Sequence, residues 1–148
     1  MKAHIVDSSA ELNFGQMGGQ SSKLIVLLAS STNVGQDPKD VATGMKLILK
    51  EYKAQCPTSH VLLLGILPCA GDAKSDERIW GNSVNQILAT YDDGQRVTYL
   101  DIGPKFLNPD STNMSDATSN VVTSKGYEIW ASAIQPVVDK YCPPAATK

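Results

Sequence analysis

The chain has 148 residues and a formal net charge of −2, and its length matches a single domain. The charge balance lacks the basic excess of a nucleic-acid-binding protein, and no apolar run reaches the ~18 residues that a membrane-spanning helix needs. The first residues lack the apolar core of a signal peptide, so we expect a cytoplasmic protein that binds neither nucleic acid nor membrane.

The first half of the chain predicts two strands and one helix. Residues 1–22 are interpreted as an N-terminal segment that ends in a glycine-rich connector. The continuous apolar run Leu24–Ala29 (LIVLLA) is typical of a buried parallel strand. A helix is expected over Pro38–Tyr52, because its apolar residues share one face, Asp37 can cap it and a proline suits its first position. The run Val61–Leu67 predicts the second strand.

The second half continues the alternation. A helix is expected over Asp76–Tyr91, with Ile79 on its inward face. The third predicted strand is Val97–Ile102, and a last helix is expected over Lys125–Tyr141 after a polar loop.

This alternation predicts the fold class and the place of any ligand site. Strands joined through helices indicate a three-layer α/β/α domain with a short parallel sheet over residues 23–142, followed by a tail at 143–148. Ligand sites in such folds lie beyond the carboxyl ends of the strands. Here that edge comprises Ser30–Gly35, Pro68–Asp72 and Gly103–Phe106.

The cysteines and tryptophans point to no special chemistry. Cys56, Cys69 and Cys142 are odd in number and widely spaced, which fits neither a disulfide framework nor a zinc site, so we interpret them as free thiols. Neither a phosphate-binding glycine motif nor a cluster of metal ligands is present, and we expect no cofactor and no metal. Trp80 and Trp130 lie at helical spacing among apolar residues and are expected in the core.

Four segments carry a family resemblance. They are, in chain order, LIVLLASSTNVGQ, VLLLGILP, VTYLDIGPKFLNPDST and SKGYEIWASAIQP. In this order they resemble the SGNH/GDSL hydrolases, particularly those similar to platelet-activating-factor acetylhydrolase subunits and related carbohydrate esterases. The resemblance implies a flavodoxin-like sheet of the SGNH-hydrolase type, here with a reduced number of strands. It also implies a serine esterase mechanism, in which a serine attacks the ester, a histidine three residues after an aspartate is the general base, and an asparagine helps to bind the oxyanion.

Asn33 is the residue that the resemblance assigns to the oxyanion hole. The family's Gly-Thr-Asn turn matches the sequence Ser31-Thr32-Asn33-Val34, although Ser31 replaces the usual glycine and Val34 a polar residue. The alternative interpretation is that Asn33 only caps a turn through its own backbone.

The family's general base has no counterpart. Counting back from Gly126 of the Lys-Gly-Tyr helix start places the histidine position at Val121 and the aspartate position at Thr118. A slipped loop could use Asp116, but no histidine follows His60. His4 is expected in solvent, and His60 is expected at the amino end of its strand, on the opposite side of the sheet from the site.

The nucleophile is expected to be missing as well, because only 32 residues precede Asn33. The nearest imitation of the family's Gly-Asp-Ser is Asp7-Ser8, and a short strand before it is feasible. Ser8 is therefore a nucleophile candidate, although a chance dipeptide is the alternative.

Three hypotheses follow. The first is a pseudoenzyme, an SGNH-like protein that acts by binding. The second, which excludes the first, is an esterase that uses Ser8 or Cys69 on a small ester ligand at a rearranged site. The third, compatible with the first, is an assembly module. In that case Leu24–Ala29 would be an open apolar edge that pairs with a second copy or with a strand-donating protein.

Overall fold

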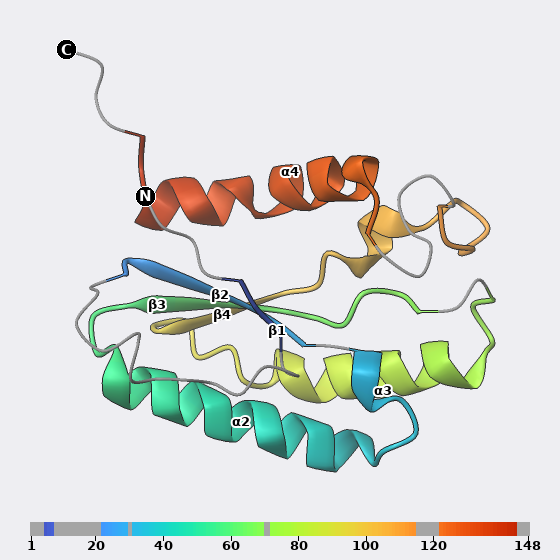
Figure 1. The fold of residues 1–148 in the computed structure, drawn as a ribbon, viewed down its shortest axis with the longest axis horizontal. Helices are drawn as coiled ribbons and strands as arrows, with labels where there is room; N and C mark the ends of the chain where they lie inside the picture. Colours follow the sequence, from blue (N-terminus) through green and yellow to red (C-terminus); the bar gives the residue numbers. More distant parts are fainter. Residues whose placement is uncertain (1–4, 8–21, 30, 70–71, 115–121, 145–148) are drawn as a thin grey trace.

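The computed structural model describes residues 5–7 (backbone alone), 22–29, 31–69, 72–114 and 122–144. These residues form three layers, with a parallel sheet between two helices on one face and one helix on the other (Figure 1). The elements are β1 (Ile5–Asp7), β2 (Leu24–Leu28), η1 (Ser31–Asn33), α2 (Pro38–Gln55), β3 (His60–Leu64), α3 (Asp76–Ala89), β4 (Val97–Leu100), η2 (Gly103–Phe106) and α4 (Ser124–Tyr141). The predicted three-layer α/β/α class is confirmed.

The sheet has the order β1-β2-β3-β4, and every pair of neighbours is parallel. Leu24 is aligned with His60, and Leu28 with Leu64, so the strands end together at one edge. All five residues of β3 are buried, which explains its continuous apolar sequence, because a central parallel strand is covered on both faces.

Helix α2 forms as its sequence predicts. The Asp37 side chain accepts a hydrogen bond from the Lys39 amide at 2.8 Å, and Pro38 occupies the first turn. Its inward face consists of Ala42, Met45, Leu49 and Tyr52.

Helix α3 corrects one expectation. Ile79, expected to face inward, is 54% exposed. It lies five residues before Val84, which places it about 140° away around the helix from that buried position. Arg78 and Trp80, its two neighbours, are buried instead.

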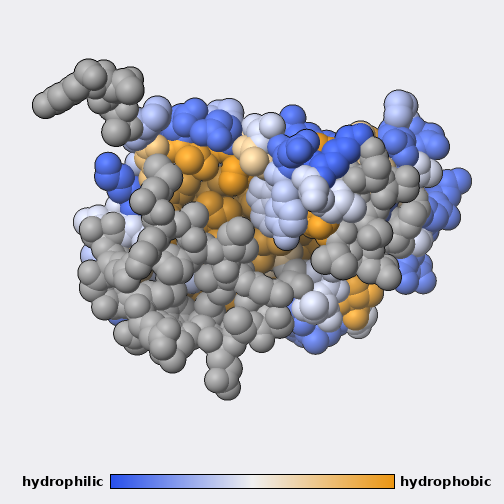
Figure 2. All heavy atoms as spheres, turned by 45° about the horizontal axis from the view of Figure 1, so that its top comes forward, coloured by the Kyte–Doolittle hydropathy of each residue, from blue (hydrophilic) through white to orange (hydrophobic). Residues whose placement is uncertain are grey.

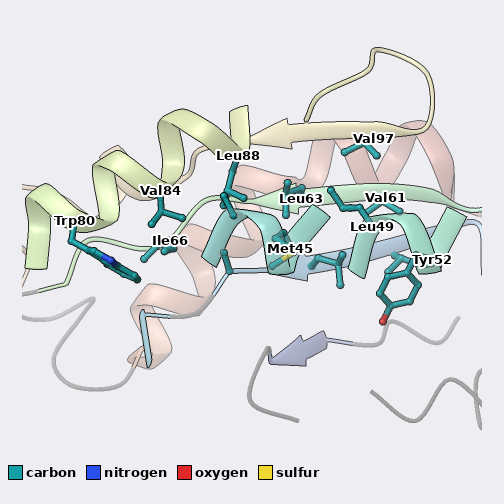
Figure 3. Close-up of a cluster of buried hydrophobic side chains, with 14 residues drawn as sticks. Met45, Leu49, Tyr52, Val61, Leu63, Ile66, Trp80, Val84, Leu88 and Val97 are labelled. Carbon is teal, nitrogen blue, oxygen red and sulfur yellow. The ribbon is translucent and has the colours of Figure 1, made fainter. Parts of the chain in front are cut away.

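Two hydrophobic clusters fill the space between the layers. In the larger one, α2 and α3 cover the sheet, as Figure 3 shows for Met45, Leu49, Tyr52, Trp80, Val84 and Leu88 against Val61, Leu63, Ile66 and Val97. The smaller one lies under α4 and contains Leu62, Leu64, Ile102, Phe106 and Trp130. The expected core positions of Trp80 and Trp130 are confirmed, at 8% and 7% exposure.

The edge of β2 differs from the expectation. β1 pairs with it in parallel from Val26 to Leu28, so this stretch is not open as the sequence suggested. A three-residue strand has no periodicity that a sequence pattern could detect. The pairing of this edge with a second copy or with a strand-donating protein stays a prediction.

On the α4 side, the side chains of Leu24, Val26 and Leu28 remain half-buried. Figure 2 shows hydrophobic surface, in orange, exposed on this side of the molecule. Helix α4 and η2 pack on this face of the sheet (Figure 1), and they do not cover β2 completely.

The three cysteines are free thiols, as expected. No helix within the described ranges is long and apolar enough to cross a membrane.

Candidate functional site

The segments that follow β2, β3 and β4 lie at the edge of the sheet where the sequence predicted a ligand site. Because β2, β3 and β4 are parallel and aligned, η1, the loop after β3 and η2 all begin at the carboxyl edge of the sheet. β1 points the same way, and Asp7 is aligned with Leu28. The next residue, Ser8, lies outside the described residues.

Asn33 ends η1 and is half-buried. Its carbonyl accepts a hydrogen bond from the Gln36 amide at 3.1 Å, and Gly35 follows with a φ of 92°, a left-handed conformation that glycine adopts without strain. The Trp80 indole donates to the Gln36 carbonyl at 2.8 Å and thereby ties this turn to α3. The turn that places Asn33 is therefore fixed by backbone bonds and by a buried tryptophan.

A cavity of about 200 Å³ lies beside Asn33. Its lining includes Asn33, Ala29, Gln36, Asp40 and Met45. No hydrogen bond of the Asn33 side-chain amide is found among the described residues. Neither the oxyanion role of Asn33 nor its turn-capping alternative is tested by this geometry, and both stay interpretations.

A second cavity, of about 220 Å³, lies at the ends of β3 and β4 and shares no lining residue with the first. Its lining includes Pro68, Cys69, Arg78, Asn82, Asn85, Asp101 and Gly103. The edge therefore holds two separate hollows.

Arg78 organises the second cavity from a position that is 5% exposed. Its guanidinium donates to the Cys69 carbonyl and to the Ser111 carbonyl, each at 3.3 Å, and to the side-chain oxygen of Asn113. The Asn113 amide in turn donates to the Pro68 carbonyl at 3.1 Å. These bonds join the loop after β3 to the loop after η2.

Asn85 anchors the end of β3. Its side chain accepts from the Ile66 amide at 2.7 Å and donates to the Ile66 carbonyl at 3.0 Å, so both backbone groups of a buried residue are satisfied. The sequence analysis missed Arg78 and Asn85. With Gly81 they occupy positions i, i+3 and i+7 on the buried face of α3, and polar residues at that spacing were the available signal.

Asp101 and Cys69 both line the second cavity, and the side chain of each forms a hydrogen bond with a nearby backbone group. The Asp101 carboxylate accepts from the Gly103 amide at 2.8 Å and so fixes the turn into η2. Burial raises the pKa of the Cys69 thiol, which donates to the Glu77 carbonyl at 3.3 Å. The thiolate that a nucleophilic cysteine requires is therefore disfavoured at Cys69.

His60 lies at the amino end of β3, on the opposite edge from Asn33, as expected. It is 5% exposed, its Nε2 is 2.8 Å from the Thr98 hydroxyl, and its ring stacks on Tyr141 with centroids 3.9 Å apart. Burial lowers the pKa of His60, and the charges of Lys140 and Arg96 act in the same direction. His4, Asp116, Thr118 and Val121 lie outside the described residues.

Comparison with known proteins supports the relationship that the sequence suggested. No family model matches the chain. A curated relative, platelet-activating factor acetylhydrolase IB subunit alpha2 of Gallus gallus, is 29% identical over 102 residues, which cover 68% of this chain and 44% of the relative.

Two solved structures share the fold. One, from Streptococcus pneumonia, carries a platelet activating factor name and has a TM-score of 0.64 at 14% identity, over 81% of this chain and 61% of its own. The other, from Bacteroides fragilis, carries an acylhydrolase name and has a TM-score of 0.67 at 20% identity, over 81% of this chain and 62% of its own. The chain is thus related to the SGNH/GDSL hydrolases and spans about half the length of the curated relative that it matches.

Proposed function

We propose that this chain is an SGNH acylhydrolase-like protein that acts by binding or assembly and does not hydrolyse esters. The observation that carries the proposal is the position of His60. This imidazole is buried at the amino edge of the sheet, whereas the oxyanion-hole position, Asn33, lies at the carboxyl edge. Ester hydrolysis by a serine requires a general base within hydrogen-bonding reach of the nucleophile.

The sequence offers no substitute base at the family's position. Val121 has no lone pair, and Thr118 carries no charge to orient an imidazole. The only other histidine is His4, which lies outside the described residues. Loss of the base from a serine hydrolase typically removes several orders of magnitude of rate, so hydrolysis is expected to be indistinguishable from background.

The test is hydrolysis of p-nitrophenyl acetate by the purified chain, compared with Asn33→Ala and with a heat-unfolded sample. The proposal expects one rate for all three. A higher rate for the folded chain that falls in Asn33→Ala would overturn it, because only a working oxyanion hole explains that pattern.

One observation favours an alternative, a serine esterase with a rearranged site. Because β1 is parallel to β2 and Asp7 is aligned with Leu28, the chain leaves β1 at the carboxyl edge immediately before Ser8. In this alternative Ser8 attacks a small ester. Labelling of the chain by a fluorophosphonate, abolished in Ser8→Ala and kept in Ser9→Ala, would favour the esterase.

A further inference from the structure

A groove on the helical layer shares no lining residue with either cavity of the carboxyl edge. It runs between the C-terminal half of α2 and the end of α3, near the amino ends of β3 and β4. Its volume is about 540 Å³, within the range of small-molecule sites. It is lined by Lys46, Leu47, Leu49, Lys50, Lys53, Thr90 and Tyr91.

The floor of the groove is apolar and fixed in place. Leu49 lies at its base and is 5% exposed, whereas Leu47 is 62% exposed at the rim. The Tyr91 hydroxyl donates to the Ala42 carbonyl at 3.1 Å, which holds the aromatic ring between the two helices. An alkyl chain placed here would contact preformed apolar surface and remove the exposed leucine from water.

The rim is cationic. Lys46, Lys50 and Lys53 follow one another at i, i+4 and i+7, so their ammonium groups lie along one side of α2. The lining contains no acidic residue, although the chain as a whole has a net charge of −2. Like charges four residues apart on a helix repel each other, and an anion between Lys46 and Lys50 would remove that penalty.

The lysines differ in their partners. Lys53 forms an ion pair with Asp93 at 2.7 Å, and the Lys46 ammonium lies 5.9 Å from the centre of the Tyr91 ring. Within the described part of the chain, no residue forms a hydrogen bond or an ion pair with the Lys50 ammonium. Lys46 and Lys50 are thus the charges that the fold leaves available to a ligand.

We propose that this groove binds a single-chain amphiphile with an anionic head group. The ammonium groups of Lys46 and Lys50 hold the head, and Leu47, Leu49 and Tyr91 contact the chain. An inorganic anion would not contact the apolar floor, and an uncharged alkyl chain would form no ionic contact with the lysines. The proposal is independent of ester hydrolysis, because the groove shares no residue with the carboxyl edge.

The test is calorimetric titration of the full chain with decanoate, with decanamide as the neutral analogue and acetate as the head group alone. Decanoate is expected to bind saturably at one site, and more tightly than either analogue. Lys50→Ala should weaken decanoate binding about two- to fivefold, the factor typical of one exposed charge pair, and Lys46→Ala/Lys50→Ala about tenfold. Leu47→Ser should also weaken it, through lost apolar contact.

Lys39→Ala is the matched control, because it removes the same charge from the first turn of the same helix, outside the groove. It should bind decanoate as the unmodified chain does. The alanine variants should keep the circular dichroism of the native chain, since alanine is the best helix former, and so should Leu47→Ser, because Leu47 is 62% exposed.

Any one of the following results of the titrations would overturn the proposal. They are the absence of saturable decanoate binding, unchanged binding in the double lysine variant, equal binding of acetate, and equal binding of decanamide. Association with anionic vesicles without binding of free decanoate would overturn it in favour of a membrane-docking surface.

Discussion

Replacing Asn85 tests whether a single side chain holds the carboxyl end of β3. In Asn85→Leu the volume is nearly kept, but the amide and the carbonyl of Ile66 lose their partners at 2.7 and 3.0 Å. Ile66 is 3% exposed, so these two groups are removed from bulk water. A buried group left unsatisfied costs about 1–3 kcal/mol, and two of them, partly offset by the apolar leucine, should lower the free energy of unfolding by about 2–4 kcal/mol.

The assay is urea denaturation followed by the fluorescence of the two buried tryptophans. Gln86→Leu is the matched control, because it replaces an exposed amide by leucine on the outer face of the same helix. It should change the stability by less than about 0.5 kcal/mol.

A second variant, Asn85→Asp, separates the two bonds. A carboxylate can still accept from the Ile66 amide, but it faces the Ile66 carbonyl, which repels it. Burial and the facing carbonyl oxygen raise the pKa of the new carboxyl group in the folded state. The loss in free energy of unfolding of Asn85→Asp should therefore be largest at neutral pH. It should shrink as the pH falls, because the protonated acid can donate a hydrogen bond to the Ile66 carbonyl. A loss below about 1 kcal/mol in Asn85→Leu, or a deficit in Asn85→Asp that grows with acid, would refute this reasoning.

Three further predictions concern the same scaffold. Gly65→Ala should destabilise the fold by about 1–3 kcal/mol, since its Cβ would lie 2.6 Å from the Tyr99 hydroxyl, whereas Gly44→Ala, with open space around it, should be neutral or stabilising in the same urea titration. Because the pKa of His60 is lowered by burial, the unfolded state takes up a proton more readily below pH ~6.5, so stability should fall as the pH drops from 7 to about 5. Urea titrations at both pH values should show a smaller loss of stability for His60→Gln than for the unmodified chain. An equal loss would show that His60 is not the cause of the pH dependence. A second copy of the chain should bind at the edge Leu24–Ala29 or at the hydrophobic surface beside it, so light scattering at increasing protein concentration should reveal a dimer. Val26→Lys should then restore the monomer. A monomer at every concentration would contradict this predicted association.

Elements with strong local signals could be predicted from the sequence. The three apolar runs became β2, β3 and β4, and the hydrogen bond that the Lys39 amide donates to the Asp37 side chain forms where the capping pattern placed it. β1 could not be recognised as clearly, because three residues carry no periodicity and their conformation depends on pairing with β2. Ile79 was placed wrongly because its five-residue spacing from Val84 turns it about 140° away from the buried face of α3.

The candidate site also has parts that the sequence predicted and parts that it did not. The turn at Asn33 was predicted, because a chain that leaves a parallel strand must continue at the carboxyl edge. The contacts of Arg78 with the loops around Cys69 and Ser111 were not, because they join residues 9 and 33 positions apart that no local pattern connects. Sequence reasoning thus located the edge, whereas its two cavities follow from long-range packing.

The groups that hold this edge are not the groups that a serine esterase uses for its chemistry. Arg78 joins the loops, Asn85 completes the backbone bonds at the end of β3, and Asp101 fixes the turn into η2. None of these contacts requires a serine, a histidine or a bound ester. The shape of the edge therefore does not depend on a catalytic base. The shape of this edge is therefore independent of the residues at Thr118 and Val121, the positions that the family resemblance assigns to the catalytic pair.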